Sequence, residues 1–113
     1  MLTIETLKQF GADTEDGLKR CMNLEDFYLE LVQTALDDTP VTELEKAISE
    51  QNLDAAFETA HAFKGVCGNL ALTPLYLPVS EITELLRSRT QTDYQPLMTE
   101  IKTQMQKLRA LAE

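Results

Sequence analysis

The chain has 113 residues, enough for one compact domain and too few for two, so we expect residues 1–113 to form a single helical domain. An apolar content of 43% argues against intrinsic disorder. Ten Lys and Arg against 19 Asp and Glu give a net charge of -9, which disfavours nucleic acid and anionic membrane surfaces as partners.

Targeting signals and metal-ligand spacings are missing from the sequence. The first residues lack the basic region and apolar core of a signal peptide, and the richest apolar stretch, residues 70–79, is too short to span a bilayer. The two cysteines, Cys21 and Cys67, are expected to be reduced and buried. We therefore expect a cytoplasmic protein, and a monomer because no surplus apolar stripe is evident.

The N-terminal third predicts three helices, because apolar residues recur at helical spacing and no segment alternates like a strand. A short helix begins at Leu2 and ends before Gly11, and a brief helical turn covers residues 14–20. Asn23 is predicted to cap a longer helix that ends at the breaker residues 37–40. Its apolar positions predict one buried stripe: Leu24, Phe27, Tyr28, Leu31, Val32 and Ala35.

The remaining sequence predicts four further helices. The first runs from about Val41 to Glu50, the second follows the turn at residues 51–52, and the last covers about residues 93–111. The third of the four begins with Thr73 as cap and Pro74 at the first helical position, and Pro78 should bend its early turns. Amphipathic helices with short loops predict an all-α fold, an antiparallel four-helix bundle with additional short N-terminal helices.

The only histidine, His61, is predicted to face away from the core. A core-facing seam is formed on its helix by Ala56, Ala60, Phe63, Cys67 and Leu70. At about 100° per residue, that seam is centred roughly 140° around the helix from the imidazole. Lys64, Gly65 and Gly68 fall within about 60° of His61, as does Leu72.

The two glycines indicate that His61 has a functional role, since each glycine inside a helix lowers its stability by about 1 kcal/mol relative to alanine. Both would let a partner approach His61, although close packing against a neighbouring helix is an alternative for Gly68. Cys67 lies on the opposite side of the helix, which disfavours a metal site, and no nucleophile–base pair or substrate cleft is indicated. An exposed imidazole is largely neutral at pH 7 and could accept a phosphoryl group, with the ammonium of Lys64 offsetting the added charge.

The segment resembles the motif of histidine-containing phosphotransfer (HPt) domains, His-x-x-Lys-Gly followed three positions later by a small residue. Here these positions are His61, Lys64, Gly65 and Gly68. Residues 17–21 and 27–31 also resemble early helices of the family. One departure is Ala71, where many members have another glycine.

The resemblance implies a phosphorelay carrier of two-component signal transduction, without autonomous catalytic activity. His61 would accept a phosphoryl group through Nε2 from a phospho-aspartate of a receiver domain and pass it to another receiver aspartate. Lys64 would give electrostatic support, while Gly65, Gly68 and Leu72 would serve clearance and docking. The chain would bind no cofactor of its own, because Mg²⁺ is expected on the receiver domain of a hybrid histidine kinase or response regulator.

Three alternatives remain at the level of sequence, of which a small metal-binding or hydrolytic helical protein is the most distant. The first is an HPt-like binding module that docks on a receiver domain without phosphotransfer; retention of both His61 and Lys64 argues against it. The second is the phosphoacceptor part of a larger kinase, against which the absence of a nucleotide-binding sequence argues.

Overall fold

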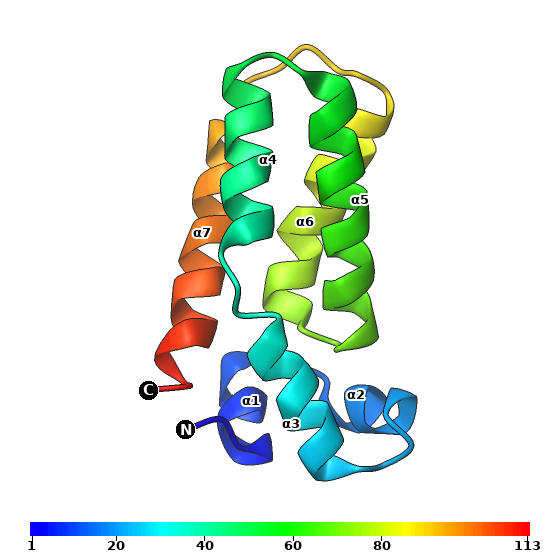
Figure 1. Cartoon of the computed structure of the whole chain (residues 1–113), viewed down its shortest axis with the longest axis vertical. Helices are drawn as coiled ribbons and strands as arrows, with labels where there is room; N and C mark the ends of the chain where they lie inside the picture. Colours follow the sequence, from blue (N-terminus) through cyan, green and yellow to red (C-terminus); the bar gives the residue numbers. More distant parts are fainter.

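The computed structural model describes residues 1–113 as seven α-helices without a strand, which confirms the predicted all-α fold (Figure 1). Three short helices precede four longer ones. Their bounds are α1 Ile4–Phe10, α2 Thr14–Arg20, α3 Glu25–Thr34, α4 Thr39–Ser49, α5 Leu53–Asn69, α6 Thr73–Arg87 and α7 Gln95–Ala110. No helix is long and apolar enough to cross a membrane.

Helices α4 to α7 form an antiparallel four-helix bundle along the 41 Å long axis of the molecule (Figure 1). Each helix packs against the next in the chain, and α7 closes the bundle against α4. The connections are short, residues 50–52, 70–72 and 88–94, so consecutive helices become antiparallel neighbours.

The predicted seam of α5 faces the centre of this bundle. Ala56, Ala60 and Cys67 have no exposed surface, and Phe63 is 3% exposed. Opposite the seam, α6 and α7 contribute a fully buried apolar stripe each: Leu75, Val79, Ile82 and Leu86 from α6, and Met98, Ile101 and Leu108 from α7. Both cysteines are buried free thiols, as expected.

Helices α1 to α3 cover the lower end of the bundle in Figure 1, and Tyr28 of α3 attaches them to α5. The Tyr28 hydroxyl donates a 2.8 Å hydrogen bond to the carbonyl oxygen of Leu70, just beyond the end of α5. Its ring fills the space left by Gly17 of α2, where an added Cβ would lie 2.6 Å from Tyr28 Cζ. Burial raises the pKa of Tyr28 to about 12.

The predicted start of α3 was wrong. Asn23 does not cap it; the capping position is Leu24, and Asn23 has a φ of 58°. The Asn23 N–H instead donates to the Leu18 carbonyl oxygen at 2.7 Å and closes the end of α2. Asparagine tolerates this left-handed conformation better than most residues, so the same side chain suits a helix end as well as a helix start.

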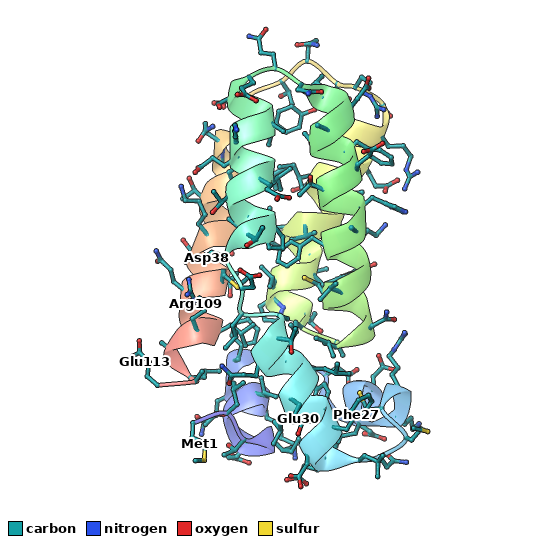
Figure 2. All side chains as sticks on the ribbon, viewed as in Figure 1. Met1, Phe27, Glu30, Asp38, Arg109 and Glu113 are labelled. Atoms are coloured by element: carbon teal, nitrogen blue, oxygen red, sulfur yellow. The ribbon has the colours of Figure 1, made fainter.

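The predicted buried stripe of α3 is only partly buried. Tyr28 and Val32 have no exposed surface, but Leu24 is 53% and Phe27 42% exposed. Figure 2 shows Phe27 at the end of the molecule away from the bundle, next to the α2–α3 turn. Only one side of α3 is covered because it caps the end of the bundle and is not enclosed within it.

Helix α6 begins one residue earlier than predicted, with Leu72 as the capping residue and Thr73 in the first turn. Pro74 fits this turn, where a missing N–H removes no hydrogen bond. Pro78 is buried inside the helix, which continues to Arg87. Because Pro78 has no N–H, the helical hydrogen bond from its position to the Pro74 carbonyl is missing.

The two ends of the chain lie close together in Figure 2. The amino group of Met1 donates to the carbonyl oxygen of Glu113, and Arg109 of α7 forms an ion pair with Asp38 at the start of α4. These contacts hold α1 and the α3–α4 connection near the end of α7.

Candidate functional site

His61 lies in the middle of α5 with its side chain exposed, on the face opposite the buried seam. This confirms the direction predicted from helical spacing. One turn earlier, Phe57 stacks against the imidazole with a centroid distance of 5.5 Å and an interplanar angle of 21°. The stack supports one face of the ring and leaves the imidazole accessible to a partner.

A groove of about 530 Å³ runs beside His61 between α2, α5 and α6. The sequence predicted that His61, Lys64, Gly65 and Gly68 share a face, and all four line this groove. The full lining comes from three helices and the adjoining loops: Asp13, Asp16, Arg20, His61, Lys64, Gly65, Gly68, Asn69, Ala71, Thr73 and Tyr76.

The two glycines of α5 have different surroundings. Gly65 is exposed, and a Cβ added there would meet no atom within 4 Å. A Cβ added at Gly68 would lie 3.2 Å from Cε1 of Tyr76 on α6. Gly65 therefore leaves open space one turn after His61. Gly68 lets the Tyr76 ring pack closely against α5, which is the alternative that the sequence left open.

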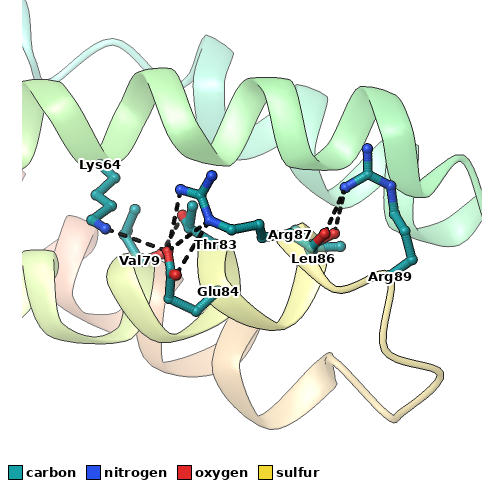
Figure 3. A network of polar contacts seen from close by, with 7 residues as sticks. All are labelled: Lys64, Val79, Thr83, Glu84, Leu86, Arg87 and Arg89. Atoms are coloured by element: carbon teal, nitrogen blue, oxygen red, sulfur yellow. Dashed lines mark hydrogen bonds and ion pairs between the residues drawn. The ribbon is translucent and has the colours of Figure 1, made fainter.

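Lys64 is oriented toward α6 and contacts Glu84 (Figure 3). Its Nζ lies 3.5 Å from Glu84 Oε2, and its side chain is 26% exposed. Arg87 also donates to Glu84, with Nε 3.3 Å from Oε1. Hydrogen bonds from Arg87, and then the charges of Arg87 and Lys64, lower the pKa of Glu84. The ammonium that the sequence predicted as a mobile charge is thus paired across the helix interface.

Two arginines that sequence reasoning missed lie beside Phe57. The guanidinium carbons of Arg87 and Arg89 are 4.9 Å and 5.0 Å from the centre of the Phe57 ring, the ring on which His61 stacks. Arg89 Nε is also 2.7 Å from Asp54 Oδ1. No spacing in the sequence signals either arginine, because they reach Phe57 from the far end of α6.

The expectation that Leu72 takes part in docking was wrong, because its side chain has no exposed surface. Helical spacing from His61 no longer applies beyond Asn69, where α5 ends. Ala71 has a φ of 54°, and this reversal turns Leu72 into the core at the start of α6. Val66 is the large apolar residue of α5 that is exposed, at 42%.

The site offers one nucleophile and no metal-ligand set. No group of three or more His, Cys, Asp or Glu side chains is arranged to hold a metal ion. Burial raises the pKa of Cys67 to about 12, so its thiol stays protonated inside the bundle. The charged groups that line the groove beside the imidazole are two cations, Arg20 and Lys64, and two carboxylates, Asp13 and Asp16. The cations can neutralise part of the charge of an anion delivered to the imidazole.

Comparison with known proteins agrees with this geometry. Neither the curated proteins nor the solved structures gave a match, whereas the family model described as Hpt domain matches residues 26–111. The matched region contains all four bundle helices and the whole of α5. Hpt domains carry phosphoryl groups on histidine in phosphorelays, interact with receiver domains and are not themselves catalysts. Since the match covers well over half of the chain, the protein belongs to the Hpt domain family.

Proposed function

We propose that this protein accepts a phosphoryl group on His61 from the phospho-aspartate of one receiver domain and passes it to an aspartate of another. The observation that carries the proposal is the exposed imidazole of His61, in the middle of α5, beside a groove with open space at Gly65. The aspartyl phosphate belongs to another domain, so the accepting atom must project from a surface that this domain can cover.

The transfer exchanges one bond to phosphorus for another. In the neutral tautomer that carries its proton on Nδ1, the Nε2 lone pair of His61 attacks the phosphorus. The Nε2–P bond forms as the P–O bond to the aspartyl oxygen breaks, and the aspartate leaves as a carboxylate. The reverse step delivers the phosphoryl group to a second aspartate. Mg²⁺ would be supplied by the receiver.

The neighbours of His61 have separate parts in this proposal. Stacking on Phe57 restricts the orientation of the imidazole, which reduces the entropy lost on reaching the attacking geometry. Lys64, one turn further along α5, supplies positive charge for the phosphoryl oxygens. Gly65 provides clearance for the receiver, since a side chain there would project into the groove.

The direct test uses a receiver domain phosphorylated on its aspartate, incubated with the protein and Mg²⁺. The expected result is an acid-labile, base-stable label on the wild type and no label on His61→Gln. The exposed position of His61 means that this substitution should leave the helical circular dichroism spectrum unchanged. Absence of label on the wild type, with a receiver that binds it, would reject phosphotransfer and favour a module that only docks.

A further inference from the structure

One carboxylate on α6 holds two cations of the site. Glu84 Oε2 accepts from Lys64 Nζ at 3.5 Å, while Glu84 Oε1 accepts from Arg87 Nε at 3.3 Å (Figure 3). The three side chains are 26%, 53% and 49% exposed for Lys64, Glu84 and Arg87. The cluster is therefore partly hydrated, and its pairs can break and re-form without leaving a buried charge unpaired.

Each of the two cations lies close to the part of α5 that carries the imidazole. Lys64 follows His61 by three residues, so the two side chains leave the same side of α5. Arg87 lies 4.9 Å from the Phe57 ring on which His61 stacks. In this structure both cations are paired with the Glu84 carboxylate.

We propose that Glu84 is a positioning residue. While His61 is unphosphorylated, Glu84 pairs with Lys64 and Arg87; when His61 is phosphorylated, the two cations pair with the phosphoryl group instead. This inference rests on the phosphotransfer proposed above. A phosphoryl group at pH 7 carries close to two negative charges and three acceptor oxygens, against one charge and two oxygens for Glu84. The two cations therefore form ion pairs with the phosphoryl group, which is the stronger anion. After the phosphoryl group is lost, they pair with Glu84 again.

This competition predicts that Glu84 slows phosphorylation of the free protein. Its ion pairs must break before Lys64 and Arg87 can turn toward the incoming phosphoryl group, and partly exposed pairs are weak. Glu84→Gln removes the charge, keeps the side-chain volume and frees both cations. We expect its phosphorylation rate to rise by about two- to fivefold, the factor that corresponds to one or two such pairs.

Phosphoramidate is a suitable donor because it needs no receiver. Nε2 of His61 attacks its phosphorus, the P–N bond of the donor breaks, and ammonia leaves with its bonding electron pair. The initial rate of phosphohistidine formation is measured for the wild type, Glu84→Gln and Glu81→Gln, with His61→Gln as the blank. Glu81 is an exposed carboxylate on the same helix that forms no ion pair, so Glu81→Gln should behave like the wild type.

Introducing Glu84→Gln with and without the two cations separates positioning of the cations from charge repulsion between Glu84 and the donor. If Glu84 acts through the cations, Glu84→Gln should give no acceleration in a chain that also carries Lys64→Gln and Arg87→Gln. Acceleration by the same factor in that chain would overturn the inference, because it would reflect repulsion between Glu84 and the donor. Equal rates for the wild type and Glu84→Gln would also overturn it.

The outcomes distinguish this inference from the function on which it rests. If receiver and phosphoramidate both fail to label wild-type His61, the phosphotransfer proposal and this inference fail together. If the wild type is labelled by both donors but Glu84→Gln behaves like Glu81→Gln, only the role of Glu84 is refuted. Circular dichroism of each variant should match the wild type, because every substituted side chain is partly or fully exposed.

Discussion

Replacement of Gly65 by alanine should make the protein more stable, and a larger side chain there should make it a poorer phosphotransfer partner. An alanine inside a helix is favoured over glycine by about 1 kcal/mol. Nothing opposes this gain at Gly65, because a Cβ there meets no atom within 4 Å. For a domain of this size, the increase in unfolding free energy should raise the Tm by about 4 °C.

Gly68→Ala is the matched control on the same helix. The intrinsic gain of about 1 kcal/mol is the same. At Gly68, however, the new methyl group would lie 3.2 Å from Tyr76 Cε1, closer than ordinary carbon–carbon contact. The Tyr76 ring must move, so we expect Gly68→Ala to be less stable than Gly65→Ala when the two are compared by urea unfolding.

The effect on transfer should depend on the size of the donor. A side chain at residue 65 projects into the groove beside His61 and obstructs a receiver, whereas phosphoramidate is small enough to pass it. Gly65→Leu should therefore slow transfer from a phosphorylated receiver by about tenfold or more, with little change in labelling by phosphoramidate.

Two results would refute this reasoning. A lower unfolding free energy for Gly65→Ala would show that residue 65 is not in open space. Transfer from the receiver at the wild-type rate in Gly65→Leu would show that the receiver does not approach over this part of the groove. The first result concerns stability and the second concerns docking, and the two assays are independent.

Two further predictions concern buried groups. Tyr28→Phe leaves the Leu70 carbonyl oxygen without its donor and should lower the unfolding free energy by about 1–3 kcal/mol in urea unfolding; an unchanged value would mean that the hydrogen bond does not hold α3 to α5. Burial raises the pKa of Cys67 from 9.0, and that of Tyr28 from 10.0, to about 12 in each case. Between about pH 9 and pH 12 the unfolded chain binds fewer protons than the folded one. The contribution of these two groups to the unfolding free energy should therefore be fully present below pH 9 and decrease as the pH rises toward 12. Cys67→Ala should delay the onset of this loss to about pH 10, and an unchanged pH profile in urea titrations would contradict the assignment.

Helical periodicity predicted much of this protein because it is a local property. Within one helix, 100° per residue fixes each side chain relative to the others, so the seam at Ala60, Phe63 and Cys67 placed His61 on the opposite face. The structure agrees, with the seam buried and the imidazole exposed. The same rule failed for Leu72, since the helix ends at Asn69 and the backbone reverses at Ala71.

Burial depends on which elements cover a helix, and a single helix pattern does not contain that information. Phe27 and Val32 belong to one apolar stripe of α3, but only Val32 meets the rest of the core. Gly65 and Gly68 are equivalent by helix propensity, and only the Tyr76 ring of α6 makes them different.

The sequence by itself determined an all-α chain, the direction of His61 and the resemblance to Hpt domains, the family whose model matches residues 26–111. These follow from spacing within single helices. The tertiary structure alone decided that Lys64 is paired with Glu84, that Arg87 and Arg89 reach the Phe57 ring, and that Gly68 serves packing. Each of these contacts joins α5 to α6 or the turn after it, and contacts between helices depend on how the helices pack against one another, which periodicity within each helix does not specify.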